Sequence, residues 1–263
     1  MKGALLFAFN NENTDYVKMA VFTAKRINQF LNLPVTLITD NKTLLSSYNY
    51  TFDNVVYIDG NKDNKRNNNT WINKGRYQAF ELSPYDETIL LDVDYVVNSD
   101  RLLKTFDIYD NFMCHKKINF LMEPNDRQEK ISYNGIDSVW ATTITFNKSK
   151  YTEHLFNCVK MVQNNYQHYV HLHSIALPYY RNDYAFAIAL RIVNGHVDNQ
   201  NNFTPWKLLH VGPNTHVYKD SDTEYTFVHD TTKNNKLKKE YITVKDTDFH
   251  MLNKINFAEL INE

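Results

Sequence analysis

The stretch SPYDETILLDVDYVV at residues 83–97 limits the possible folds of this chain more than any other feature. Its first residues favour a turn, because a residue that precedes proline is pushed out of the helical region and because aspartate supports turns. The apolar run that follows lacks the alternation of a strand with one solvated face. It therefore predicts a strand that is buried on both faces, as in a mostly parallel sheet.

Shorter apolar runs upstream extend this pattern. They predict strands at residues 3–9, 35–39 and 55–58. Between the first two runs, residues 17–31 carry apolar side chains at the three- and four-residue spacing of an amphipathic helix. Thr14 or Asp15 stands where the cap of that helix is expected. The alternation of strands and helices predicts an α/β fold with a Rossmann-like, mostly parallel sheet flanked by helices.

Elsewhere the pattern is less regular. It predicts helices at residues 71–80, 150–169 and 184–193, a half-exposed strand at residues 138–146, and short strands and turns at residues 200–230. Asn182 or Asp183 is placed to cap the helix at residues 184–193. Because no linker or internal repeat interrupts the chain, we expect residues 1–263 to form one domain with a small C-terminal region of strands and turns.

Asp92 and Asp94 interrupt the apolar run two residues apart. In an extended chain such residues point the same way, so that both carboxylates can reach one point. Two unpaired carboxylates would repel each other, and a divalent cation such as Mg²⁺ or Mn²⁺ neutralises both. A pair of aspartates at a strand end can also simply cap a loop. The position favours the metal interpretation, because ligands bind beyond the carboxyl ends of strands in open α/β sheets.

The composition sets few limits on function. The formal net charge of -1 indicates no general attraction to nucleic acid or to membrane surfaces. No apolar stretch approaches the ~20 residues of a membrane-spanning helix, and the N-terminal residues lack the pattern of a signal peptide. Cys114 and Cys158 stand alone, without the spacing of a metal site. We therefore expect a soluble, cytoplasmic protein with reduced thiols.

Three motifs together resemble the GT-A family of nucleotide-sugar glycosyltransferases. They are Leu90-Leu91-Asp92-Val93-Asp94, the segment around Arg76 that precedes it, and Arg181-Asn182-Asp183-Tyr184-Ala185. Within the family the chain is similar to glycogenin-like and lipopolysaccharide-galactosyltransferase-like enzymes and to small glycosyltransferases of bacteriophages. The resemblance extends from residue 3 to about residue 193. It implies a metal-dependent enzyme that transfers a sugar from a nucleotide sugar, with a UDP-sugar expected, to an acceptor hydroxyl.

The resemblance also implies a metal site. Asp92 and Asp94 correspond to metal ligands of the family, and a C-terminal histidine supplies a third ligand. His250 fits this role best, and His210 is its rival. Lys254, a few residues after His250, would touch the diphosphate of the donor. The metal would be Mn²⁺ or Mg²⁺.

Donor-binding residues follow from the same resemblance. The nucleoside would lie beside the end of the first strand and the start of the next helix, near Phe9, Asn10, Asn11, Tyr16 and Asp40. Tyr16 would stack on the base, although a tyrosine of the core is an equal alternative. Arg76 would anchor the diphosphate or the sugar, unless it is a plain surface arginine. Asp183 would orient sugar hydroxyls, unless it only caps its helix.

The division of the chain and the acceptor follow less directly. Residues 1–100 would form the nucleotide- and metal-binding half, and residues 101–263 the acceptor half with the metal-ligating tail. The acceptor would be a saccharide or lipid or, for a phage-type enzyme in the host cytoplasm, a hydroxymethylpyrimidine in DNA. Basic residues that could contact a DNA backbone are Lys62, Lys65, Arg66, Lys74, Lys233, Lys236, Lys238 and Lys239.

Two other classes of protein stay open. A nucleotidyltransferase that forms nucleotide sugars should carry a glycine-rich, arginine-containing loop after its first strand, where this chain has Asn10-Asn11-Glu12-Asn13. A non-catalytic module that binds nucleotide sugars would keep the fold without needing the pair of aspartates. Both alternatives are weaker than the transferase interpretation.

Overall fold

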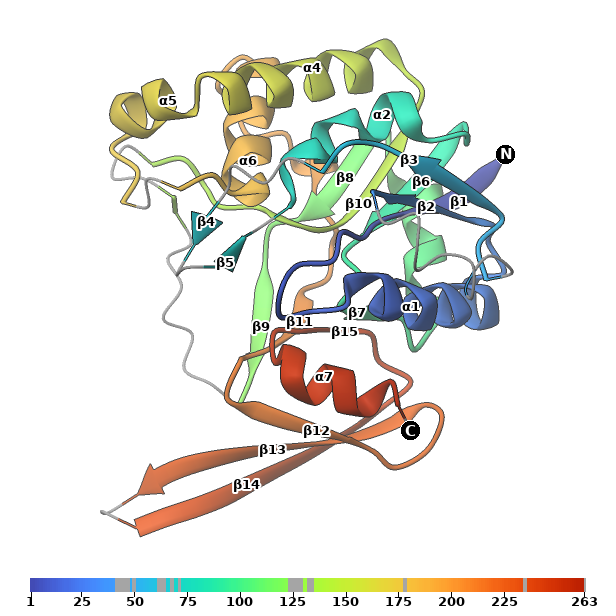
Figure 1. Cartoon of the computed structure of the whole chain (residues 1–263). Coiled ribbons are helices and arrows are strands. Elements are labelled where there is room, and N and C mark those ends of the chain that lie inside the picture. The colour runs from blue at the N-terminus through green and yellow to red at the C-terminus, as the bar shows by residue number, and fades with distance from the viewer. Residues whose placement is uncertain are drawn as a thin grey trace.

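The structure is a computed structural model that describes residues 1–40, 48, 51–60, 65–66, 69–70, 72–122, 130–131, 135–176, 179–233 and 236–262. Its main sheet has six strands in the order β3-β2-β1-β6-β10-β8 (Figure 1). They are β1 (Lys2–Phe7), β2 (Val35–Thr39), β3 (Asn54–Tyr57), β6 (Glu87–Leu91), β8 (Phe112–His115) and β10 (Trp140–Asn147). β1, β2, β3 and β6 run parallel, and β10 is antiparallel to both of its neighbours. The predicted α/β class with a mostly parallel sheet is confirmed.

The strand that ends at the two aspartates lies inside this sheet. β6 pairs with β1 on one side and with β10 on the other, and residues 88–91 are buried, as predicted. Helix α1 (Tyr16–Leu31) connects β1 to β2. Its N-terminal cap is Asp15, whose carboxylate accepts a hydrogen bond from Lys18 N at 2.9 Å. The sequence therefore predicted both the strand and the helix that adjoin the candidate site.

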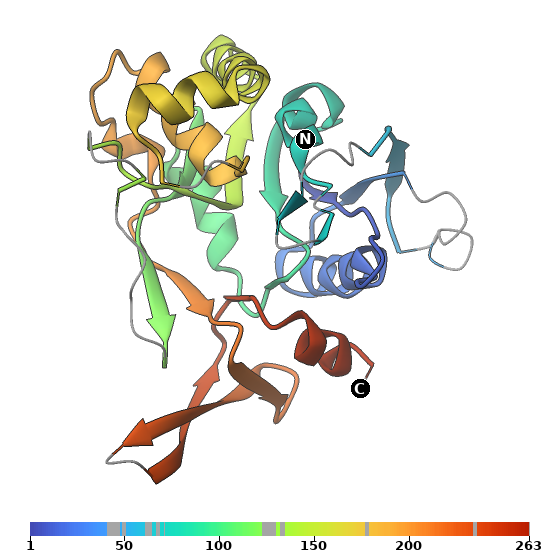
Figure 2. The ribbon, with the colours of Figure 1, turned by 60° about the vertical axis from the view of Figure 1, so that its left-hand side comes forward.

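Helices cover both faces of the main sheet (Figure 2). One face packs against α1, which is joined by α7 (Lys254–Leu260) through the rings of Phe22 and Phe257. The other face packs against α2 (Ala79–Leu82), α4 (Lys150–Asn164), α5 (Tyr166–His173) and α6 (Asn182–Val193). Shorter elements are β4 (Lys65–Arg66), β5 (Asn69–Thr70), α3 (Thr105–Ile108) and the 3₁₀ helices η2 (Lys74–Gln78), η3 (Arg101–Lys104) and η4 (Gln200–Asn202). No helix in the described ranges is long and apolar enough to span a membrane.

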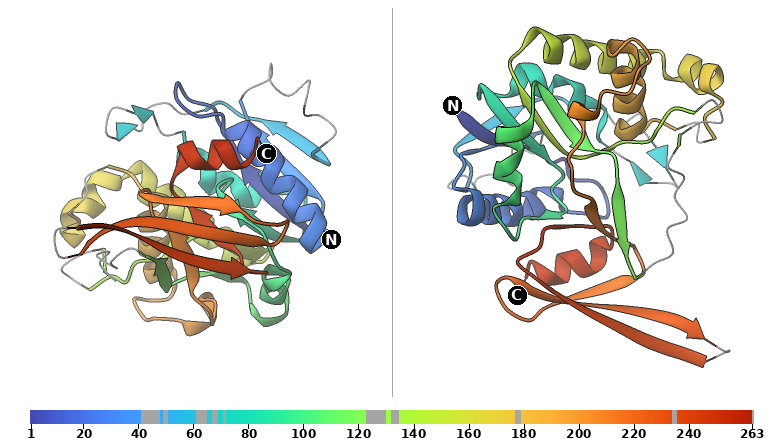
Figure 3. Two further views of the ribbon diagram at one scale, coloured as in Figure 1. Left: turned by 90° about the horizontal axis from the view of Figure 1, so that it is seen from below. Right: turned by 180° about the vertical axis from the view of Figure 1, so that it is seen from behind.

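Two smaller sheets hold the C-terminal part of the chain. One has the order β7-β15-β11-β9 and comprises β7 (Tyr95–Val96), β9 (Ile118–Leu121), β11 (Leu208–Val211) and β15 (Phe249–Met251). The other comprises β12 (Thr215–Lys219), β13 (Glu224–Lys233) and β14 (Lys236–Lys245), and its β13–β14 hairpin extends away from the main sheet (Figure 3). The sequence predicted short strands here. The whole of β14 lies beyond the predicted region at residues 200–230 and was missed, because its many lysines give the segment the polar composition of a loop.

β10 differs from the predicted half-exposed strand, because residues 140–146 are all buried. The threonines that suggested a solvated face find partners inside the protein. Thr143 Oγ1 lies 2.6 Å from His115 Nδ1, and Thr145 Oγ1 donates to Thr105 Oγ1 at 2.7 Å. A threonine whose hydroxyl is hydrogen-bonded can be buried at little cost, and the prediction of a solvated face was therefore wrong.

Two predicted helices are also corrected. In place of the helix predicted at residues 71–80, residues 74–82 form the 3₁₀ helix η2 and a single turn of α2, consistent with the low helix propensity of Gly75. The segment at residues 150–169 divides into α4 and α5 at Asn165, whose Nδ2 donates to Met161 O at 2.9 Å. Such local side-chain bonds compete with the continuation of a helix. Met161 on α4 is 40 % exposed.

His115 should make the stability of this fold depend on pH. The side chain is buried, and burial lowers its pKa to about 3. An unfolded histidine titrates near pH 6.5, so below that pH the unfolded chain binds a proton that the folded chain does not. The free energy of unfolding should therefore fall by about 2 kcal/mol between about pH 6.5 and about pH 4.5 because of this residue alone.

Urea unfolding of the wild type and of His115→Gln at these two pH values measures the effect. The variant lacks the titrating group. Lowering the pH should therefore reduce its free energy of unfolding by about 2 kcal/mol less than it reduces that of the wild type. Equal losses in the two proteins would contradict the assignment.

Candidate metal and nucleotide site

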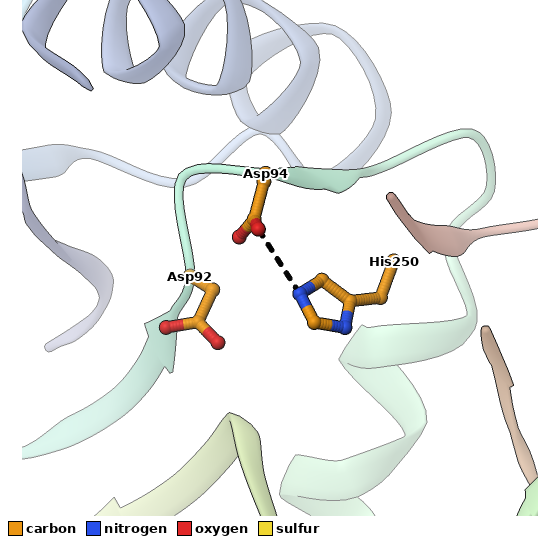
Figure 4. Close-up of side chains that lie close together, drawn as sticks. All are labelled: Asp92, Asp94 and His250. Carbon is orange, nitrogen blue, oxygen red and sulfur yellow. Dashed lines mark hydrogen bonds and ion pairs between the residues drawn. The ribbon is translucent and has the colours of Figure 1, made fainter. Parts of the chain in front are cut away.

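The site begins where β6 ends, in the turn that carries Asp92 and Asp94. Asp92 N donates to Thr142 O of β10 at 2.8 Å, and Tyr95 N donates to Asp92 O at 3.1 Å, which closes the turn before β7. The side chain of Asp94 is 11 % exposed, whereas that of Asp92 is 31 % exposed. Both carboxylates face the same space, into which His250 also projects (Figure 4).

Two polar side chains on the buried face of helix α1 donate hydrogen bonds to the backbone of this turn and of the residues that follow it. Thr23 Oγ1 donates to Val93 O at 2.7 Å, and Arg26 Nε donates to Val97 O at 2.9 Å. These bonds satisfy carbonyl groups of an irregular backbone that would otherwise be buried without partners. The sequence interpretation missed both residues. Their one signal is their position, three residues apart among the apolar side chains of the helix.

The C-terminal tail brings His250 to the turn. β15 pairs antiparallel with β7, so that His250 stands opposite Tyr95, and Met251 N donates to Asp94 O at 3.0 Å. Asp248 strengthens this pairing, since its Oδ1 accepts hydrogen bonds from Asn98 N at 2.7 Å and from the Ser99 hydroxyl at 3.0 Å. The tail is therefore fixed to the strand that follows the aspartates.

His250 completes a group of three metal-ligating side chains. Its Nε2 lies 3.1 Å from Asp94 Oδ2, and one ligand atom from each of Asp92, Asp94 and His250 lies within 4.8 Å of the others. Carboxylates suit hard divalent cations and imidazole suits transition metals, so this set of donors fits Mn²⁺. His210, the rival ligand, lies behind His250, with 3.1 Å between the two Nδ1 atoms.

Two cationic side chains adjoin the carboxylates. Arg76 Nη1 forms an ion pair with Asp92 Oδ1, and Lys254 Nζ forms one with Asp94 Oδ2. Arg76 is 7 % exposed, yet its Nε and Nη2 have no hydrogen-bond partner among the described residues. Lys254 Nζ also donates to Met251 O at 3.1 Å, and burial lowers its pKa to about 7 although the charge of Asp92 opposes this shift. The site thus holds donors for an anion as well as ligands for a cation.

The expected nucleoside residues lie at the start of α1, but several serve the local backbone. Asn10 Oδ1 accepts from Val17 N at 2.9 Å, and Asn11 Oδ1 accepts from Thr14 N at 2.9 Å. Phe9 is buried in the core. Tyr16 is partly buried at the start of α1, and burial raises the pKa of its hydroxyl, with a smaller contribution from the charge of Asp92.

Asp40 follows β2 and packs closely on Gly60, where a Cβ would lie 2.4 Å from Asp40 Oδ2. Of the basic residues considered for DNA, Lys62 lies outside the described residues, Lys74 is partly buried in η2, and Lys238 and Lys239 are exposed on β14. None of these residues is brought to the metal-ligating group by a contact in the described part of the chain.

Neither Asn182 nor Asp183 caps the helix that follows, contrary to the prediction. Helix α6 begins at Asn182, and Arg181 occupies the cap position without a capping side-chain bond. Asp183 instead accepts from Ala141 N at 2.9 Å and from Arg181 Nη2 at 2.8 Å. Ala141 precedes the residue whose carbonyl binds Asp92 N, so these contacts place Asp183 near the end of β6. A tertiary contact has replaced the local cap.

Comparisons with known proteins give matches among solved structures alone. No protein-family model and no curated protein matches the sequence. The chain is similar to the galactosyltransferase LgtC in complex with donor and acceptor sugar analogues, with 15% identity, a TM-score of 0.49, and 72% of this chain and 70% of that chain covered.

Two further matches are also to glycosyltransferases. Mouse xyloside xylosyltransferase 1 shares 9% identity at a TM-score of 0.46, with 78% of this chain and 84% of that chain covered. GlyE of Streptococcus pneumoniae TIGR4 shares 13% identity at a TM-score of 0.43, with 78% and 45% covered.

Proposed function

We propose that this protein is a metal-dependent glycosyltransferase, which moves a sugar from a nucleoside-diphosphate sugar to an acceptor hydroxyl. One observation carries the proposal: Asp92, Asp94 and His250 present ligand atoms within 4.8 Å of one another where β6 ends, and two cations adjoin the same carboxylates. A divalent cation beside fixed positive charges suits a diphosphate leaving group.

The residues of the site have separate tasks in this proposal. Asp92, Asp94 and His250 would hold Mn²⁺ or Mg²⁺, which when bound supplies positive charge that stabilises the departing nucleoside diphosphate. Arg76 keeps two donors, Nε and Nη2, that no described residue uses, and phosphate oxygens fit such a planar pair. Lys254 is anchored to the backbone beside Asp94 and adds a second positive charge when its amine is protonated.

The donor is proposed to be a UDP-sugar that lies across the ends of β1 and β6. Tyr16 is the candidate to stack on the base, since it is partly exposed at the start of α1. Asp183 uses one lone pair on each oxygen for Ala141 N and Arg181, and a carboxylate has further lone pairs that can accept sugar hydroxyls. Residues 1–100 would then form the nucleotide half, and residues 101–263 the acceptor half and the metal-ligating tail.

The acceptor is proposed to be a saccharide or a lipid, with hydroxymethylpyrimidine in DNA as the second candidate. The net charge of -1 gives a DNA substrate no general attraction. The exposed Lys238 and Lys239 on the projecting hairpin are the feature that keeps DNA among the candidates. We propose that the enzyme works in the cytoplasm.

Calorimetric titration of UDP into the full chain, with Mn²⁺ and with EDTA, tests the proposal. Binding should require Mn²⁺, because the diphosphate then shares the cation held by the aspartates and the histidine. GDP, ADP and CDP serve as comparisons for the base. If no nucleotide binds, or if binding is the same in EDTA, the proposed function is wrong. If UDP binds as expected, release of UDP from a panel of UDP-sugars with glycan, lipid and hydroxymethylated DNA acceptors follows.

A further inference from the structure

His210 is a buried histidine that has no task in the function proposed above. It is fully buried in β11, which runs parallel to β15, and it stands opposite His250 in the register of the two strands. The two Nδ1 atoms are 3.1 Å apart. Its ring centroid lies 4.8 Å from that of Phe120 and 5.0 Å from that of Trp140. The ring centroids of His210 and His250 are 4.9 Å apart with their planes tilted by 55°, and the aromatic rings of Phe120 and Trp140 flank His210.

We propose that His210 is a positioning residue that orients His250 for metal binding, an inference that rests on the proposed function. A metal-ligating histidine usually donates its second ring N–H to a partner, which fixes both its tautomer and the direction of its ring. His210 Nδ1 is that partner for His250 Nδ1. The bond leaves His250 Nε2 directed at Asp94, 3.1 Å away, which is where the cation would be shared.

The chemistry of the pair explains why a histidine suits this place. Without a cation, the contact between His250 Nε2 and Asp94 needs a proton on Nε2, because a carboxylate only accepts. In a neutral His250 the Nδ1 atom is then an acceptor, and His210 must donate. With a cation on Nε2, a neutral His250 carries its proton on Nδ1, and His210 must accept. A backbone carbonyl or a carboxylate could serve only the second arrangement.

The protons balance between the two arrangements. His250 and His210 carry one ring proton each in both cases, so the buried pair gains no net charge. When the cation binds, one proton passes from His210 Nδ1 to His250 Nδ1 along their hydrogen bond. Solvent receives the proton displaced from His250 Nε2 and supplies one proton to His210 Nε2, so that both rings stay neutral. An imidazole at position 210 can therefore follow the change of tautomer that metal binding imposes on His250.

Binding of Mn²⁺ to the full chain without nucleotide, followed by the paramagnetic resonance signal of free Mn²⁺, tests this role. His210→Phe keeps a ring among Phe120 and Trp140 but has no nitrogen, and it should raise the Kd for Mn²⁺ by about 10- to 100-fold. His210→Asn carries an amide near the position of Nδ1 that can donate or accept, and its Kd should lie closer to that of the wild type. Histidine ¹⁵N NMR should show His250 protonated at Nε2 without metal and at Nδ1 with Mg²⁺.

His115→Phe is the matched control, because it also replaces a buried histidine, whose own hydrogen bond goes to Thr143. It should leave the Kd for Mn²⁺ unchanged. A folded His210→Phe with the wild-type Kd would overturn the inference, and so would His210→Asn as weak as His210→Phe. If His210→Phe does not fold, His210→Asn and the NMR tautomers decide. Wild-type Mn²⁺ binding that is absent, or that survives Asp94→Asn, would instead overturn the metal site and the proposed function.

Discussion

Asp94→Asn should abolish the Mn²⁺-dependent binding of UDP and lower the turnover of a sugar donor by at least about 10³-fold. The substitution replaces an anionic ligand by a neutral amide and leaves the ammonium of Lys254 without its carboxylate. Both changes raise the local positive charge, which weakens the affinity for a divalent cation. A loss of about 4 kcal/mol of transition-state stabilisation corresponds to the expected factor. Steady-state release of UDP at saturating Mn²⁺ measures it.

Asp198→Asn is a suitable control for this substitution. Asp198 pairs with Lys116 and Arg191 in a cluster on the surface, so the same change of charge is made away from the candidate ligands. Its turnover should equal that of the wild type. Thermal unfolding of Asp94→Asn establishes that the variant is folded. If the folded variant keeps wild-type turnover, the two aspartates are structural and the proposed mechanism is wrong.

The elements that adjoin the site were predictable because their causes are local. The apolar run before Asp92 and the capping position of Asp15 depend on neighbouring residues, and both are found as expected. The cap predicted at Asn182 or Asp183 failed because Asp183 forms a contact with Ala141, 42 residues away. The sequence shows that a carboxylate lies near a helix start. It does not show that the backbone N–H of a distant strand will bind this carboxylate in place of the helix.

The supports of the site depend on long-range pairing, which spacing cannot show. His250 is 156 residues from Asp94 and reaches it because β15 pairs with β7. Thr23 and Val93 are 70 residues apart, and the hydroxyl donates to a carbonyl that exists only once the turn has formed. A polar residue on the apolar face of a helix indicates that its side chain has a hydrogen-bond partner in the core. Only the fold identifies that partner.

Arg76→Met should lower the turnover of a sugar donor by about 10²- to 10³-fold while leaving the free energy of unfolding unchanged or raising it by up to about 2 kcal/mol. The guanidinium is buried, and two of its nitrogens lack partners among the described residues, so burying it costs desolvation that its single ion pair offsets only in part. Its partner Asp92 is 31 % exposed on its side chain and can be solvated when the arginine is gone.

Arg76→Lys separates charge from geometry in the same experiment. Lysine keeps the cation but not the planar pair of donors, so a role in binding the diphosphate predicts a turnover between those of Arg76→Met and the wild type. Guanidinium chloride unfolding and donor turnover are measured on all three proteins. A structural arginine would give the opposite result for Arg76→Met, a clear loss of stability with turnover retained in the folded fraction. If Arg76→Met raises the free energy of unfolding and lowers the turnover, the arginine serves ligand binding and not the fold. A side chain selected for the fold alone would not be buried with two hydrogen-bond donors unused.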